Sequence, residues 1–217
     1  MNHEERYTTE DIYQFLKNGE TLEYADLRES QLIGIDLAGI SLRGADLQYT
    51  DLRHANLERT ILEDANLQGA NLSGASLKGA HLSGANLDNA RLDNASLLRT
   101  TLCRVSCRNA SFSHGSLRLV DITESDFTGA NFHGANLRGA KGALTAKFNN
   151  TDLTDARGDE TLLDVQDLKA VGANTTNIQG VRVRVFDFLK VDQESWFQRL
   201  KKSIRDFGKK KLAVSKK

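Results

Sequence analysis

The chain has 217 residues, and its 29 lysine and arginine residues balance 29 aspartate and glutamate residues, so the formal net charge at pH 7 is zero. This balance argues against a protein whose main partner is nucleic acid. No apolar run approaches the roughly 18 residues of a membrane-spanning helix, and the first residues lack the apolar core of a signal peptide. We therefore expect the protein in the cytoplasm, or peripherally at the inner face of a membrane.

Residues 1–20 are predicted to form a helical cap. Thr8 or Thr9 can begin the helix as its N-cap, and Gly19 can end it. An apolar stripe on one face would cover the exposed edge of whatever structure follows. The stripe consists of Ile12, Phe15 and Leu16.

Residues 21–158 follow a five-residue period. An apolar residue occupies every fifth position from Leu22 to Leu137, and the residue two positions earlier is usually alanine, as in GANLSGASLKGAHLSGANLDNA. Where Cys107 replaces the leucine, Val105 replaces the alanine, so the two volume changes offset each other as a packed interior requires. We predict that these two positions point inward and that the other three point outward.

The pattern A(D/N)LxG, as in GADLQYTDLRHANLERT, resembles the pentapeptide-repeat family over about residues 22–153. The opening phrase DIYQFLKNGETLEYADL is similar to cyanobacterial members that have an N-terminal helix. The resemblance implies an all-β solenoid, namely a right-handed quadrilateral β-helix in which each pentapeptide forms one side and about four form a coil. Such a coil is too thin to bury its leucines alone, so its stability comes from its neighbours.

The register slips after Leu137, because the next alanine-to-apolar unit arrives one residue late. A bulge or loop is therefore expected near residues 141–145. For residues 159–189 two interpretations remain open: a short helix over about 160–171, or degenerate coils that keep the five-residue period.

Residues 190–217 are predicted to form an amphipathic basic helix and a tail. The helix could cover an open end of the stack, dock on a partner protein, or lie on an anionic membrane surface. Its apolar stripe contains Trp196, Phe197, Leu200, Ile204 and Phe207, and its basic residues include Lys201, Lys202 and Arg205.

A basic interval lies within the repeats, because no acidic residue occurs between Asp93 and Asp121. A partly apolar basic patch there is a candidate contact site for a partner. The candidate residues are Leu98, Arg99, Arg104, Arg108, Arg118 and Leu119.

Signals for catalysis are nearly absent. There is no phosphate-binding glycine loop and no metal motif, so we predict no enzyme activity, no cofactor and no metal site. His114 and His133 should be neighbours on adjacent coils, but two ligands alone do not make a metal site. Cys103 should point outward and Cys107 inward, so they should not pair.

The sequence therefore predicts a non-enzymatic protein-interaction or scaffold module that presents side-chain ladders to an unidentified protein, with homo-oligomer formation left open. One alternative is a DNA-mimicking protein that binds type II topoisomerases, as some members of the resembled family do. That alternative requires an acidic surface, which the basic interval interrupts. A second alternative is a membrane-peripheral scaffold anchored by the C-terminal helix.

Overall fold

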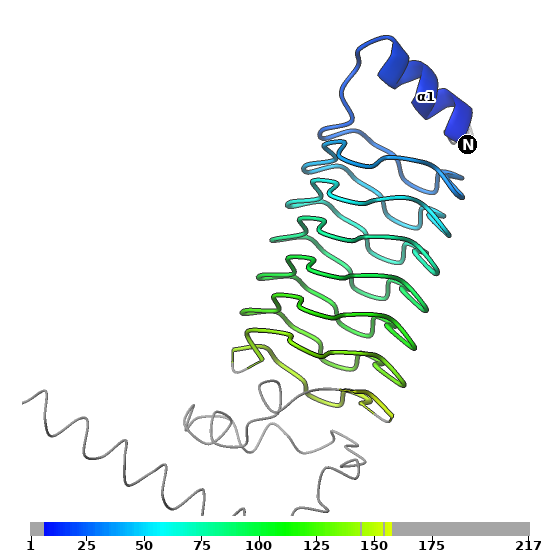
Figure 1. The fold of residues 1–217 in the computed structure, drawn as a ribbon. Coiled ribbons are helices and arrows are strands. Elements are labelled where there is room, and N and C mark those ends of the chain that lie inside the picture. The colour runs from blue at the N-terminus through cyan, green and yellow to red at the C-terminus, as the bar shows by residue number, and fades with distance from the viewer. Residues whose placement is uncertain (1–6, 144, 154, 158–217) are drawn as a thin grey trace, which may run out of the picture. The chain divides into compact units, whose positions relative to one another are not determined.

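The computed structural model describes residues 7–143, 145–153 and 155–157. Within them, one helix, α1 (Thr9–Lys17), is followed by a stack of coils (Figure 1). No described helix has the length and apolar character needed to cross a membrane. The predictions for residues 159–189 and for the amphipathic segment 190–217 lie outside the described residues.

Helix α1 begins with a capping box, which satisfies backbone donors at the helix start. The Thr8 hydroxyl accepts a hydrogen bond from the Asp11 N–H at 3.4 Å, and the Asp11 carboxylate accepts one from the Thr8 N–H at 2.7 Å. Asn18 forms the C-cap, and Gly19 follows with a φ of 78°. Thr8 is therefore the N-cap, and glycine follows the helix end as the sequence indicated.

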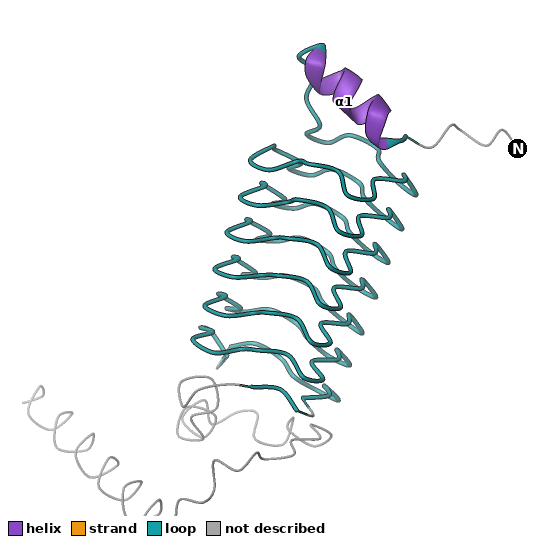
Figure 2. Cartoon of the chain, turned by 45° about the vertical axis from the view of Figure 1, so that its right-hand side comes forward, coloured by secondary structure: helices purple, strands orange, loops and turns teal. Residues whose placement is uncertain are grey.

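The helix contacts the first coil. Ile12 is fully buried within the hydrophobic core of the coils. The Tyr13 hydroxyl accepts a hydrogen bond from the Asp36 N–H at 3.0 Å, and the Gln31 N–H donates to the Tyr7 carbonyl at 3.0 Å. These contacts place α1 at the N-terminal end of the stack (Figure 2).

Each coil contains twenty residues, because parallel bridges join a residue to its equivalent four pentapeptides later. Asp26 pairs with Asp46, and Asp46 pairs in turn with Asn66. Within the described ranges these bridges are isolated, so each side of a coil is only a minimal strand. Four pentapeptides make one turn, and the coil therefore has four sides.

The four sides are numbered by the large inward residue that each carries on the first coil. Side 1 carries Leu22, side 2 carries Leu27, side 3 carries Leu32 and side 4 carries Leu37, and residues twenty positions later lie on the same side of the next coil.

Backbone hydrogen bonds connect each coil to both of its neighbours. The Leu47 N–H donates to the Asn66 carbonyl at 2.7 Å, and the Asp46 N–H donates to the Ala25 carbonyl at 2.9 Å. At the corner, the Thr50 N–H donates to the Leu47 carbonyl at 3.2 Å and closes a turn. The outward side chains therefore repeat from coil to coil in straight columns, about 4.8 Å apart as in any β-ladder.

The corners require a left-handed backbone. The residue two after each inward residue has positive φ at all 24 corners from Tyr24 to Gly139, and fourteen of these residues are not glycine. A non-glycine residue costs about 1–2 kcal/mol in this conformation. The carboxylate of Asp46, just before the inward residue, supports its turn by accepting the Gln48 N–H at 3.2 Å.

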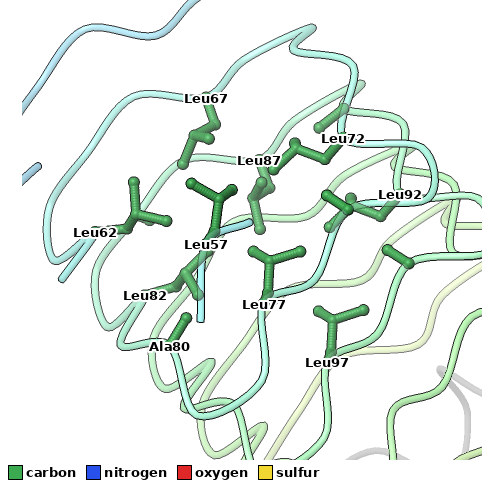
Figure 3. Packing of buried hydrophobic residues seen from close by; sticks show 14 of the residues in the cluster. Leu57, Leu62, Leu67, Leu72, Leu77, Ala80, Leu82, Leu87, Leu92 and Leu97 are labelled. Carbon is green, nitrogen blue, oxygen red and sulfur yellow. The ribbon is translucent and has the colours of Figure 1, made fainter. Parts of the chain in front are cut away.

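The interior consists of the residues predicted to point inward. Every fifth residue from Leu22 to Leu137 is buried, with at most 2 % of its surface exposed. Figure 3 shows the leucines from Leu57 to Leu97 pointing into the interior. Cys107 and Val105 are both buried, in agreement with their paired replacement. Toward the C-terminal end aromatic rings fill the interior, and Phe112 and Phe132 stack with centroids 4.8 Å apart.

Several alanine positions carry buried hydroxyl groups instead. Thr50 and Thr60 donate to leucine carbonyls of the preceding coil, at 2.8 Å in each case. Ser30 occupies the equivalent position on the first coil, where no preceding coil offers a carbonyl. Its hydroxyl is buried and has no hydrogen-bond partner among the described residues.

The register slip is accommodated between two bridges. Asp121 pairs with Lys141, twenty residues later, whereas Asp126 pairs with Lys147, twenty-one residues later. The Thr145 hydroxyl accepts the Glu124 N–H at 2.9 Å, so a side chain replaces the backbone acceptor at this point. The coil beyond the slip keeps the same stacking.

Candidate interaction surface

The six residues predicted as a contact site lie at three places on the stack. Leu98, Arg99, Arg118 and Leu119 lie on side 4 and its following corner. The Arg99 N–H donates to the Arg118 carbonyl at 3.0 Å, so these two residues occupy adjoining coils. Arg104 and Arg108 lie elsewhere, and each has different surroundings.

Arg108 lies on side 2 and is engaged by carboxylates. The guanidinium of Arg108 lies 3.1 Å from an oxygen of Asp126, and the backbone N–H of Arg108 donates to the Asp88 carboxylate at 2.8 Å. Lys147 also lies 3.6 Å from Asp126. Asp126 falls outside the acid-free interval of the sequence but belongs to the next coil, so Arg108 is balanced by a charge that sequence proximity does not reveal.

Arg104 is exposed at the corner that follows side 1. Arg104 borders an open, polar hollow together with Asp64 and Glu63. The Glu63 carboxylate is paired with Arg43. Arg104 therefore faces acidic surroundings.

Side 4 carries an additional arginine that the sequence analysis missed. Arg138 is exposed and lies on the coil after Arg118, since the Leu119 N–H donates to the Arg138 carbonyl at 2.9 Å. The twenty-residue separation from Arg118 was the signal that could have identified it. We call the outward residues of these three coils the arginine face. It consists of Ser96, Leu98, Arg99, Ser116, Arg118, Leu119, Asn136 and Arg138.

The arginine face differs in charge arrangement from the rest of the stack. Elsewhere several cations pair with a carboxylate, either one coil away, as for Lys78 and Glu58 at 2.9 Å, or two residues away, as for Arg53 and Asp51 at 2.7 Å. The described residues provide no ion pair for Arg99, Arg118 or Arg138, and the face itself carries no acidic residue.

The carboxylates that border this face are held by other groups. Asp121 accepts the Thr123 hydroxyl at 2.6 Å, and this hydrogen bond holds the pKa of the Asp121 carboxyl below its ordinary value. Asp93 accepts the Ser111 hydroxyl and lies 3.6 Å from Arg91. The arginines are thus left facing solvent, beside Leu119 with 41 % of its surface exposed.

The remaining candidates for chemistry are separate groups. His114 and His133 are neighbours with ring centroids 5.2 Å apart, as predicted. Among the described residues no three histidine, cysteine or acidic side chains gather in a way that could hold a metal ion. Cys103 and Cys107 are both free thiols. Burial raises the pKa of each thiol, and strongly so for Cys107.

The family model for pentapeptide repeats matches residues 25–64, 60–97 and 106–141 with eight copies, which together make up half of the chain. The chain belongs to the pentapeptide-repeat family. This confirms the resemblance drawn from the A(D/N)LxG pattern, and the twenty-residue coil is consistent with it. A comparison with curated proteins found no match.

Three solved structures illustrate the similarity to other pentapeptide-repeat proteins. HetL, involved in heterocyst differentiation regulation in Nostoc sp. strain PCC 7120, is 31 % identical over 62 % of this chain and 70 % of its own, with a TM-score of 0.38. A protein from the Arabidopsis thaliana thylakoid lumen is 28 % identical over 50 % of this chain and 69 % of its own, with a TM-score of 0.35. Trypsin-treated QnrB1, a plasmid-mediated fluoroquinolone resistance protein, is 18 % identical over 70 % of this chain and 90 % of its own, with a TM-score of 0.37.

Proposed function

We propose that this pentapeptide-repeat protein is a non-enzymatic interaction module that presents fixed columns of side chains to a partner protein in the cytoplasm. The observation that carries the proposal is the arginine face. Its cations and two leucines are positioned on three coils by backbone ladder bonds, yet nothing among the described residues neutralises the cations. A charged and partly apolar surface of this kind is typical of a contact site.

We further propose that the coil is right-handed and that both ends of the stack are covered. The buried Ile12 of α1 supports a cover at the N-terminal end. On the last described coil Phe148 and Leu153 are only partly buried, so a cover by residues 159–217 would remove apolar surface and an open edge from water. The predicted apolar stripe around Trp196 is suited to covering this end of the stack, and equally to docking on a partner protein or a membrane.

DNA mimicry is a weaker proposal, because it needs a continuous acidic surface and the arginine face interrupts one. Attachment to a membrane through residues 190–217 is the other competing proposal. The experiment below distinguishes membrane attachment from protein binding, and DNA mimicry would appear in it as retention of a type II topoisomerase.

The experiment is a quantitative pull-down from the cells that express the protein, using the full chain and a chain that lacks residues 190–217. Retention of the same protein by both supports the coil stack as the binding element. Loss of the retained protein on truncation would assign binding to the C-terminal segment. If neither chain retains a protein and the full chain sediments with anionic vesicles, the interaction-module proposal is overturned in favour of a membrane-peripheral role.

A further inference from the structure

The cations of the arginine face form an uncompensated cluster on two neighbouring columns: Arg118 and Arg138 lie in one column, and Arg99 lies in the adjoining corner column. Arg99, Arg118 and Arg138 lie on three consecutive coils, and two ladder bonds connect these coils directly. Like charges on neighbouring coils repel each other, although solvent screens the repulsion. At Lys78 and Glu58, by contrast, opposite charges occupy equivalent positions of adjoining coils and form an ion pair.

The two leucines show that the face does not suit a purely ionic ligand. Leu98 adjoins Arg99 in the chain, and Leu119 adjoins Arg118, so cations and apolar groups alternate over two coils. A nucleic acid backbone would leave these leucines without an apolar counterpart. A protein segment that carries both carboxylates and apolar side chains would match both features.

The spacing of the cations favours a helix over a strand. Coils stack at about 4.8 Å, so three coils span about 9.6 Å along the axis of the stack, with Arg99 one column to the side of Arg118 and Arg138. Side chains seven residues apart on one helix face are separated by about 10.5 Å, with an intermediate one at about 4.5–6 Å. Alternate side chains of an extended strand are about 6.6 Å apart, a distance that does not match the spacing of about 4.8 Å between coils.

We propose that the arginine face binds an acidic amphipathic helix of a partner protein. This proposal rests on the interaction function proposed above. Carboxylates spaced three or four residues apart on that helix would pair with Arg99, Arg118 and Arg138. Apolar residues beside this acidic stripe would cover Leu98 and Leu119.

The probe is a short alanine-based helical peptide with glutamates at positions i, i+4 and i+7, flanked by leucines and labelled for fluorescence anisotropy. A peptide with glutamines in place of the glutamates is its control. We expect the full-length protein to bind the glutamate peptide at least about tenfold more tightly than the glutamine peptide, with affinity that falls as salt rises. Equal affinity for the two peptides would overturn the proposal.

The variant Arg99→Glu/Arg118→Glu should weaken binding of the glutamate peptide about tenfold or more. A matched control is Arg59→Glu/Arg104→Glu, which makes the same charge change at two exposed corner arginines outside the face. We expect it to change affinity less than about twofold. Melting curves should show that both variants are folded. An equal loss of peptide affinity in the two variants would show that only the net charge of the protein matters, and would overturn the proposal.

Further measurements identify other occupants. Tighter binding of a single-stranded oligonucleotide or of phosphatidylserine vesicles than of the peptide would overturn the assignment to a protein helix. The chain also contains Glu160, Asp164 and Asp167 at helical spacing. If Glu160→Gln/Asp164→Asn/Asp167→Asn raises peptide affinity about tenfold, the face belongs to the chain's own acidic segment, whereas unchanged affinity supports an external partner.

Failure of this proposal is distinguishable from failure of the proposed function. If the pull-down retains a protein equally well with Arg99→Glu/Arg118→Glu and the peptide does not bind, the arginine face is not the contact site but the interaction module stands. If the pull-down retains nothing, the proposed function fails on its own evidence.

Discussion

The inward and outward columns of the coils obey different rules, although they alternate along the same short sides. Leu77 is fully buried, whereas the side chain of its neighbour Lys78 is half exposed and forms an ion pair. Inward positions accept a narrow set of volumes, because each must fill space between two coils. Outward positions accept almost any residue. Unpaired charges can therefore occupy them, as on the arginine face, and can contribute to binding without disturbing the fold.

The largest expected difference between the two kinds of position is in thiol reactivity. Cys103 is partly exposed and Cys107 is fully buried. A bulky thiol reagent should label Cys103 in the folded protein, and faster as pH rises, because burial and the contact with Asp121 raise the pKa of its thiol. Cys107 should be labelled about a thousandfold more slowly, since only unfolded molecules expose it. Mass spectrometry of single-cysteine variants measures both rates, and rapid native labelling of Cys107 would contradict the inward assignment.

Truncation of an inward leucine should give the next largest effect. Leu72→Ala or Leu77→Ala should lower the free energy of unfolding by about 2–5 kcal/mol, because each leaves a cavity between coils. Lys78→Ala removes only a solvent-exposed ion pair with Glu58 and should cost less than about 0.5 kcal/mol. Chemical denaturation of the three variants measures these values. Similar losses in all three would show that the columns do not differ as described.

A smaller effect should distinguish two buried hydroxyls within the inward columns. Ser30→Ala should raise the free energy of unfolding by about 1 kcal/mol, because it removes a buried hydroxyl without a partner. Thr60→Ala is the matched control and should lower it by about 1 kcal/mol or more, since it removes a hydrogen bond to the Leu37 carbonyl and a methyl group. Urea denaturation compares the two, and destabilisation by Ser30→Ala would mean that its hydroxyl is satisfied in solution.

The interior could be predicted from the sequence in detail. The five-residue period identified every inward residue from Leu22 to Leu137, and the paired change at Cys107 and Val105 already indicated a packed space. The corners were predicted only in part. Glycine two residues after the inward residue marks many corners in the sequence, but Tyr24 and other non-glycine residues adopt the same left-handed conformation. Local preference is overridden there because the ladder bonds of the whole coil require the turn.

The candidate site was predicted less completely than the core. A gap in the acidic residues drew attention to Arg99 and Arg118, but it also included Arg108, which Asp126 engages, and omitted Arg138. Counting charges along the chain cannot separate these cases. Residues 18 or 20 positions apart in sequence are neighbours in the stack, and electrostatic interaction depends on that distance in space.

The sequence by itself determined which residues are buried, because removing apolar side chains from water imposes a period that any fold of this chain must satisfy. Only the tertiary structure decided which outward charges meet, through the twenty-residue turn and its change to twenty-one residues after Lys141. It also decided that the hydroxyl of Ser30 has no acceptor while that of Thr60 has one. Both residues occupy the alanine position of the repeat, but a coil precedes that of Thr60 and none precedes that of Ser30.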